Sequence, residues 1–174
     1  MMVTGSRVAA VVAAVVTGLM MLPAAASAAA PQKKSGKLPS SACKLLASAQ
    51  VQKVLTGATD GKPIHDKADK EEICNWEVEG SSDYLAVTVR SITADPTVAK
   101  ALYGTTDPDR KVKGLGKAAA FAPNDSDFTV RAALGKVALI VKLQRSDYSP
   151  GNPDDVAKLK SDATSVAKQA AKKL

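Results

Sequence analysis

The sequence predicts an α+β domain in which an antiparallel sheet of about five strands packs one face against helices, in the order α-ββ-α-βββ-α. Three observations predict this class. Several short segments alternate apolar and polar residues, as strands with one buried face do. Residues 153–174 repeat apolar positions at intervals of three and four, as an amphipathic helix does. The short connections between the strands favour antiparallel pairing.

The opening element is expected between Ser40 and Gly57, as a short amphipathic helix or a broken pair of helices. Ser48 suits the cap of a second helical segment, and Gly57 suits its end. The apolar residues with helical spacing are Leu45, Leu46, Val51, Val54 and Leu55. The following residues, 58–70, are polar and contain Asp-Gly and Lys-Pro pairs, so they are predicted to form a loop.

A β-hairpin is predicted at residues 71–90. In the segment EEICNWEVEG, Cys74, Trp76 and Val78 alternate with polar residues, and the residues after the turn at 80–83 alternate in the same way. A short helix should follow, because Asp95 and the proline after it suit the cap and the first helical position. Its expected buried residues are Val98, Ala101 and Leu102.

Three further strands are predicted at residues 117–122, 127–134 and 137–144. The last helix has the clearest signals in the chain. Asn152 can cap it, Pro153 suits its first position, and the two aspartates that follow suit the positive end of the helix dipole. Its apolar stripe is expected to cover the sheet.

The N-terminus resembles a secretory signal. One arginine precedes an apolar run that is shorter than a membrane-spanning helix, and Ala26-Ser27-Ala28 supplies the small residues of a cleavage site. We therefore expect residues 1–28 to be a signal peptide cleaved after about Ala28, residues 29–39 a flexible tether, and residues 40–174 one domain. An uncleaved anchor is the alternative. No cysteine lies at the cleavage point, so we expect no lipid anchor.

Composition narrows the classes of partner. The formal net charge of +7 falls to +6 when the leader is removed, which makes the mature chain mildly basic. Only six aromatic residues occur, so the stacking surfaces that bind single-stranded nucleic acid are scarce. We expect a secreted monomer that does not bind nucleic acid.

The two cysteines, Cys43 and Cys74, have a single possible intramolecular pairing, and an exported chain favours a disulfide. That bond would hold the opening helix on the core side of the sheet, next to Trp76. A redox-active pair would have closely spaced cysteines, and a zinc site would need more ligands than these cysteines and one histidine supply. We predict a structural disulfide, no metal and no cofactor.

A resemblance accompanies these motifs. Cys43-Lys44-Leu45-Leu46, Cys74-Asn75-Trp76 and the later GLGKAA segment with its two strands and terminal helix resemble a family of small actinobacterial exported proteins. Most of that family are lipoproteins that carry a domain of unknown function. The resemblance spans about residues 40–174 and implies an envelope or extracellular location and the same disulfide, but no activity. This chain differs in lacking the lipidation cysteine.

No catalytic constellation is evident, so we predict that the chain is not an enzyme. His65 beside Asp66 could act as an oriented base, which keeps an extracellular hydrolase as an alternative. Residues 124–127 could offer oxygen ligands to calcium but lack the rest of a calcium loop, and the glycines at 114 and 116 are more typical of a turn than of a phosphate loop. A rigid loop at 105–113 would suit a secreted enzyme inhibitor, a further alternative.

The predicted function is that of a secreted, non-catalytic binding or envelope-associated protein. Two surfaces are expected to be positive and to attract anionic wall polymers or lipid headgroups weakly. One is the outer side of the last helix, with Lys158, Lys160, Lys168, Lys172 and Lys173. The other is the polar face of the sheet, with Thr88, Arg90, Thr129, Arg131, Lys142 and Gln144.

Overall fold

The structure, a computed structural model, describes residues 38–174 except 93–94, 117, 124–126 and 150. The described residues belong to one compact unit, Gln32–Leu174. Three predicted features lie outside the described residues: the signal peptide, nearly all of the tether, and residues 124–126 of the possible calcium segment at 124–127. No described helix is long and apolar enough to cross a membrane.

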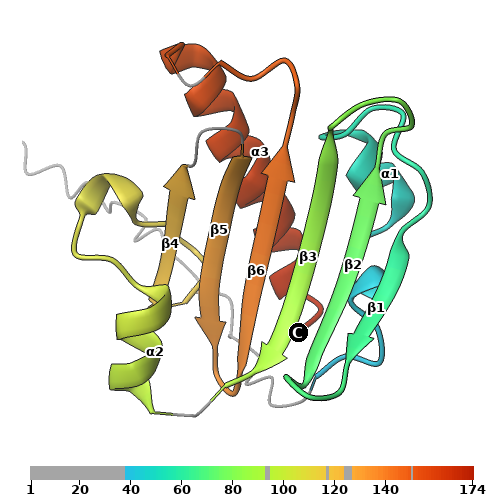
Figure 1. The fold of residues 1–174 in the computed structure, drawn as a ribbon. Coiled ribbons are helices and arrows are strands. Elements are labelled where there is room, and N and C mark those ends of the chain that lie inside the picture. The colour runs from blue at the N-terminus through green and yellow to red at the C-terminus, as the bar shows by residue number, and fades with distance from the viewer. Residues whose placement is uncertain (1–37, 93–94, 117, 124–126, 150) are drawn as a thin grey trace, which may run out of the picture. The chain divides into compact units, whose positions relative to one another are not determined.

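The described chain forms one six-stranded antiparallel sheet with the strand order β1-β2-β3-β6-β5-β4 (Figure 1). The predicted α+β class with an antiparallel sheet is confirmed. The strands are β1 (Lys62–Asp66), β2 (Glu71–Glu77), β3 (Tyr84–Ser91), β4 (Ala118–Pro123), β5 (Asp127–Leu134) and β6 (Val137–Gln144).

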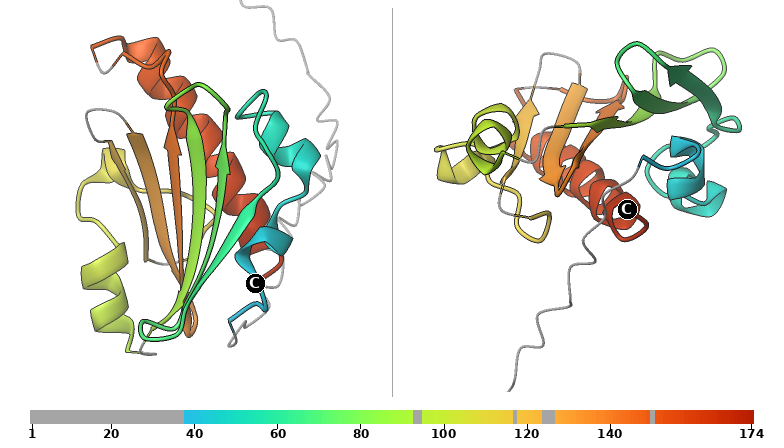
Figure 2. Two further views of the ribbon diagram at one scale, coloured as in Figure 1. Left: turned by 45° about the vertical axis from the view of Figure 1, so that its right-hand side comes forward. Right: turned by 90° about the horizontal axis from the view of Figure 1, so that it is seen from below.

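Three helical segments cover one face of the sheet: the short 3-10 helix η1 (Ala42–Leu45), α1 (Ser48–Gln52) and the long α3 (Pro153–Ala171) (Figure 2). The opening element is thus the broken pair that the sequence allowed. The core between the layers contains the alternating residues of the two central strands, such as Val87 and Val141, with Leu159 and Val166 of α3. Removing these side chains from water is the main stabilising term of such a fold.

The Cys43–Cys74 disulfide joins η1 to β2, with the two Cα atoms 5.0 Å apart. Cys74 is fully buried, and Trp76 on the same face of β2 is nearly so. The bond closes a loop with a sequence separation of 31. Because the helical segment and the strand lie in different layers, the disulfide fixes the opening element on the core face, as predicted.

Helix α3 begins where the sequence predicts, because Asn152 caps it by accepting a hydrogen bond from the backbone N–H of Asp154. Arg145, which follows β6, connects the end of that strand to α3. Its guanidinium pairs with Asp147 and lies 3.6 Å from the Asp162 carboxylate of α3. Burial raises the pKa of Asp162, and the charge of Arg145 opposes that rise.

Strand β1 is a correction, because its residues were expected to be part of a loop. All five pair with β2, from Lys62 opposite Asn75 to Asp66 opposite Glu71. Four of the five are exposed, as an edge strand with a proline can be. The sheet therefore has six strands instead of about five. The additional strand precedes the predicted hairpin in the chain.

Helix α2 (Pro96–Tyr103) is capped by Asp95 as predicted, but it packs differently. Its buried residue is Tyr103, which packs on Ala118 and Ala138 on the sheet face opposite α3. Val98, Ala101 and Leu102, the expected buried residues, are exposed. The expectation that the helices cover a single face is therefore wrong for α2, which lies at the β4 and β5 end of the other face (Figure 1).

Candidate functional site

Three lysines of α3 form what we call the lysine stripe: Lys158, Lys168 and Lys172. Their spacing of ten and four residues places them within one side of the helix, because each residue turns the helix by about 100°. The opposite side contacts the core through Leu159, Val166 and Ala170. All three stripe lysines are exposed, and they extend along about 21 Å of the helix.

No described carboxylate forms an ion pair with the stripe lysines, although Asp162 lies close enough to Lys158 to be influenced by its charge. The Lys168 side chain passes over Gly114, and the neighbouring Lys113 is exposed. Lys168 and Lys172 also lie near the negative end of the helix dipole, which stabilises their positive charges. The stripe is therefore a solvent-facing row of cations at a rigid helix.

The other two lysines predicted for this surface are engaged in structural contacts. Lys160 donates a hydrogen bond to the carbonyl of Asp109 at 2.9 Å, and its ammonium lies 3.9 Å from the centre of the Phe121 ring. Lys173 donates to the carbonyl of Lys44 at 3.0 Å. These contacts hold the 3-10 helix η2 (Pro108–Arg110) and η1 against α3. They leave fewer donors for a ligand than the sequence suggested.

The sheet face opposite α3, which we call the open face, is not positive overall. Strand register places β1 and β2 carboxylates on this face beside the predicted cations. Its strand residues with formal charge are Lys62, Arg90, Arg131 and Lys142 against Asp66, Glu71, Glu77 and Asp127. Since the cations and carboxylates are equal in number, this part of the expectation is wrong.

Most open-face cations are also paired. Lys142 contacts the nearly buried Asp127 at 2.9 Å and lies over the Tyr84 ring, and hydrogen bonds to these two residues raise the pKa of Lys142. Arg90 donates to the Tyr103 hydroxyl at 2.9 Å and to Glu71 at 3.3 Å, and these contacts raise its pKa. Pairing satisfies these charges within the fold, so they offer little to an external anion.

His65 contacts Glu72 across the β1–β2 pair, and not its neighbour Asp66. The Asp66 carboxylate accepts the backbone N–H groups of Ala68 and Asp69 and so stabilises the turn. A His-Glu pair on an edge strand could orient a base. The His65 side chain is half exposed, however, and lines neither the cleft beside the β2–β3 turn nor the groove beside α2, so its geometry does not favour the hydrolase alternative.

The remaining motifs have structural roles. Gly114 and Gly116 both have positive φ and flank the buried Leu115, so this segment is a turn, as predicted. Among the described residues, no group of three or more potential ligands could hold a metal ion. Asp127, the one described acid of the possible calcium segment at 124–127, pairs with Lys142.

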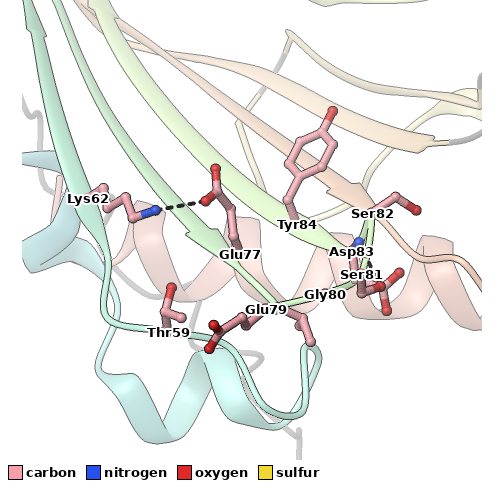
Figure 3. A pocket seen from close by; sticks show the side chains of 10 residues that line it. Thr59, Lys62, Glu77, Glu79, Gly80, Ser81, Ser82, Asp83 and Tyr84 are labelled. Atoms are coloured by element: carbon pink, nitrogen blue, oxygen red, sulfur yellow. Dashed lines mark hydrogen bonds and ion pairs between the residues drawn. The ribbon is translucent and has the colours of Figure 1, made fainter.

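A cleft of about 520 Å³ lies beside the β2–β3 turn, where no sequence motif predicted one (Figure 3). Its charged residues are Lys62, Glu77, Glu79 and Asp83, and Lys62 pairs with Glu77 at 2.9 Å. Burial alone would raise the pKa of Asp83, but hydrogen bonds from Ser146 and Ser81 and the nearby Arg145 lower it. The cleft is net negative, which disfavours anion binding there.

Comparisons with protein-family models, with characterised proteins and with solved structures found no match for this chain. The resemblance to the actinobacterial exported family therefore stays a prediction. The function has to be argued from the surfaces described above.

Proposed function

We propose that the chain is an exported, non-catalytic protein that associates with anionic polymers of the cell envelope through the lysine stripe of α3. The observation that carries this proposal is the contrast between two surfaces. On the open face, cations are matched by carboxylates and mostly paired, whereas the stripe lysines have no carboxylate in salt-bridge contact among the described residues. A row of unpaired cations on a rigid helix attracts polyanions over a range set by salt.

Export is proposed from the signal-like N-terminus and is supported by the Cys43–Cys74 disulfide, a bond typical of oxidising compartments. Mass spectrometry of culture supernatant tests it. We expect a product that starts at about residue 29. A product that retains the leader in the membrane fraction would contradict the proposed location.

Binding is tested by cosedimentation with purified cell wall and, in parallel, with anionic vesicles. The test variant is Lys158→Gln/Lys168→Gln/Lys172→Gln. The control, with the same net charge, replaces three exposed lysines elsewhere, Lys67, Lys100 and Lys136. Each lysine near an anionic surface contributes about 1 kcal/mol, so the stripe variant should bind about 100-fold more weakly at low salt.

The control variant should bind nearly as well as the wild type. High salt should abolish the binding of the wild type and of the control. Equal losses in the two variants would show that only net charge matters, which would remove the lysine stripe as the site. Binding to wall but not to vesicles would identify polymers as the source of the anions, and the reverse result would identify lipid headgroups.

A second candidate function, inhibition of an extracellular enzyme, is favoured by the structure of the 105–113 loop. The loop is held internally by Asp107, which accepts the N–H of Asp109, and externally by the buried Val112 and the Lys111–Ala120 bridge. Pull-down from culture supernatant, followed by an activity assay of any recovered enzyme, tests this function. An inhibitor should lower that enzyme's activity, and recovery without inhibition would exclude it.

A further inference from the structure

The turn that precedes β4 at residues 113–116, which we call the glycine turn, offers backbone donors to a ligand. Gly114 and Gly116 have φ angles of 83° and 89°, whereas the φ of Leu115 between them is not positive. A backbone that alternates in this way can direct successive N–H groups toward one side, where they bind an anion. Among the residues that the structure describes, the N–H groups of Gly114 and Gly116 have no hydrogen-bond acceptor.

The hydrophobic core holds the glycine turn in place. The Leu115 side chain is buried in the main core, together with Val112 just before the turn. The backbone also approaches the sheet closely, because a Cβ atom at Gly116 would lie 3.1 Å from the carbonyl oxygen of Ala133 on β5. Donors that are fixed before a ligand arrives lose little conformational entropy on binding. The turn is therefore a preorganised set of donors.

Lys168 of α3 places a cation directly beside this turn. A Cβ atom at Gly114 would lie 3.3 Å from Cε of Lys168 and 3.8 Å from its Nζ. The absence of a side chain at Gly114 thus leaves room for the lysine to cross the turn. No described residue forms an ion pair or a hydrogen bond with the Lys168 ammonium. This ammonium and the Gly114 N–H are close enough for one small anion to contact both.

The charge around the glycine turn also favours an anion. Residues 111–116 and 163–174 contain no aspartate or glutamate, and Lys113 and Lys172 are exposed within these two segments. The negative end of the α3 dipole lies nearby and opposes an anion, but it amounts to about half a charge. The full charges of Lys168 and Lys172 in the last turns of the helix exceed it.

We propose that the glycine turn and Lys168 bind a phosphate group, carried by an envelope polymer or by a lipid headgroup. This inference rests on the proposed function, because Lys168 belongs to the lysine stripe, and it names the class of anion. The oxygens of a phosphate surround one centre and can accept from two backbone N–H groups and an ammonium together, whereas a carboxylate has two oxygens in one plane. The glycine turn leads into a strand and not into a helix, so it is not a nucleotide-binding phosphate loop.

Binding isotherms at low salt with two soluble polymers test the proposal: polyphosphate, and polyacrylate, whose anions are carboxylates. The wild type should bind polyphosphate at least about 10-fold more tightly, which is the effect of about one charge-assisted hydrogen bond. Lys168→Gln should lose most of this preference. Lys158→Gln is the matched control, since it removes the same charge from the stripe at a distance of about 15 Å along the helix. It should weaken the binding of both polymers equally and keep the preference.

The outcomes separate this proposal from the proposed function. Equal affinity of the wild type for the two polymers would overturn the phosphate site and leave the lysine stripe as a general site for anions. Binding to neither polymer would overturn both. If Lys158→Gln reduced the preference as much as Lys168→Gln does, the preference would come from charge density alone, and the phosphate site would be overturned.

Amide NMR locates the site, and cosedimentation identifies the source of the phosphate. The N–H proton signals of Gly114 and Gly116 should move downfield with polyphosphate, because both groups gain an acceptor, and unmoved signals at saturation would overturn the proposal. Lys168→Gln and Lys158→Gln are then compared on cell wall and on phosphatidylglycerol vesicles. A greater loss for Lys168→Gln on the wall identifies a phosphate polymer, and the same result on vesicles identifies a lipid headgroup. Equal losses of the two variants on both materials would overturn the proposal.

Discussion

Gly61, immediately before β1, lies against the disulfide and the only tryptophan. A Cβ atom at this position would lie 2.5 Å from Cys74 Sγ and 2.7 Å from two atoms of the Trp76 ring. Neither neighbour can rotate away, since Cys74 is covalently bonded to Cys43 and Trp76 is buried in the core. Gly61→Ala should therefore force the backbone of β1 away from β2.

The cost follows from the rigidity of both neighbours. Overpacking in a filled core costs about 1–3 kcal/mol, and fixed neighbours place Gly61→Ala at the upper end, near 3 kcal/mol. That is a large part of the 5–15 kcal/mol typical of a whole domain, as a rough scale. Urea unfolding followed by the fluorescence of Trp76 measures the loss directly. Thermal unfolding should shift down by about 10 °C.

Gly151→Ala is the matched control, because a Cβ atom there would meet nothing within 4 Å. It should leave the unfolding free energy unchanged within about 0.5 kcal/mol. If Gly61→Ala unfolded at the wild-type urea concentration, the close packing of β1 on the disulfide would be refuted. An equal loss in both variants would point to a general effect of replacing glycine.

Three further outcomes are expected. Cys43→Ser/Cys74→Ser should lower the unfolding free energy by about 3–4 kcal/mol, from the chain entropy of a closed loop of this length, and the native protein should resist thiol labelling. Asp83→Asn should be less stable than the wild type at neutral pH. Because the folded pKa of Asp83 is lowered, that difference should begin to shrink as the pH falls below about 4 and should vanish below the folded pKa, which urea titrations at several pH values would show. Tyr103→Phe removes the hydroxyl that accepts from Arg90 and should cost about 1 kcal/mol in urea unfolding, with faster amide exchange in α2.

Elements with strong local patterns could be predicted from the sequence. The alternation in β2, β3, β5 and β6 follows from one buried face, and the caps of α3 are local signals that the fold retains. The disulfide was predictable because two cysteines allow a single intramolecular pairing. These features depend on residues close together in the chain or, for the disulfide, on the number of cysteines.

Features that depend on tertiary context were not predictable in the same way. Strand β1 has no alternation because its residues are exposed on both faces, and its pairing with β2 provides the order that its pattern lacks. Helix α2 presents a hydrophobic side at Val98 and Leu102, but it packs through Tyr103 at its last turn. Local periodicity could not show which side of the sheet would receive this helix.

The sequence contains part of the signal for the charge of the open face. Glu77 alternates with the buried Trp76, so the hairpin pattern alone places it on the polar face, opposite Tyr84. The partner of Lys142 could not be anticipated, because Asp127 belongs to a different strand and is buried against it. Lys160 and Lys173 contact backbone carbonyls distant in sequence, so their engagement depends on tertiary structure.

The lysine stripe is tested most directly by an NMR titration of the isotope-labelled protein with soluble polyphosphate, a defined polyanion. Amide shifts should concentrate in α3, around Lys158, Lys168 and Lys172, and should disappear at high salt. Shifts centred on Arg131 and Lys142 of the open face, or no shifts at low salt, would exclude the lysine stripe as the binding surface.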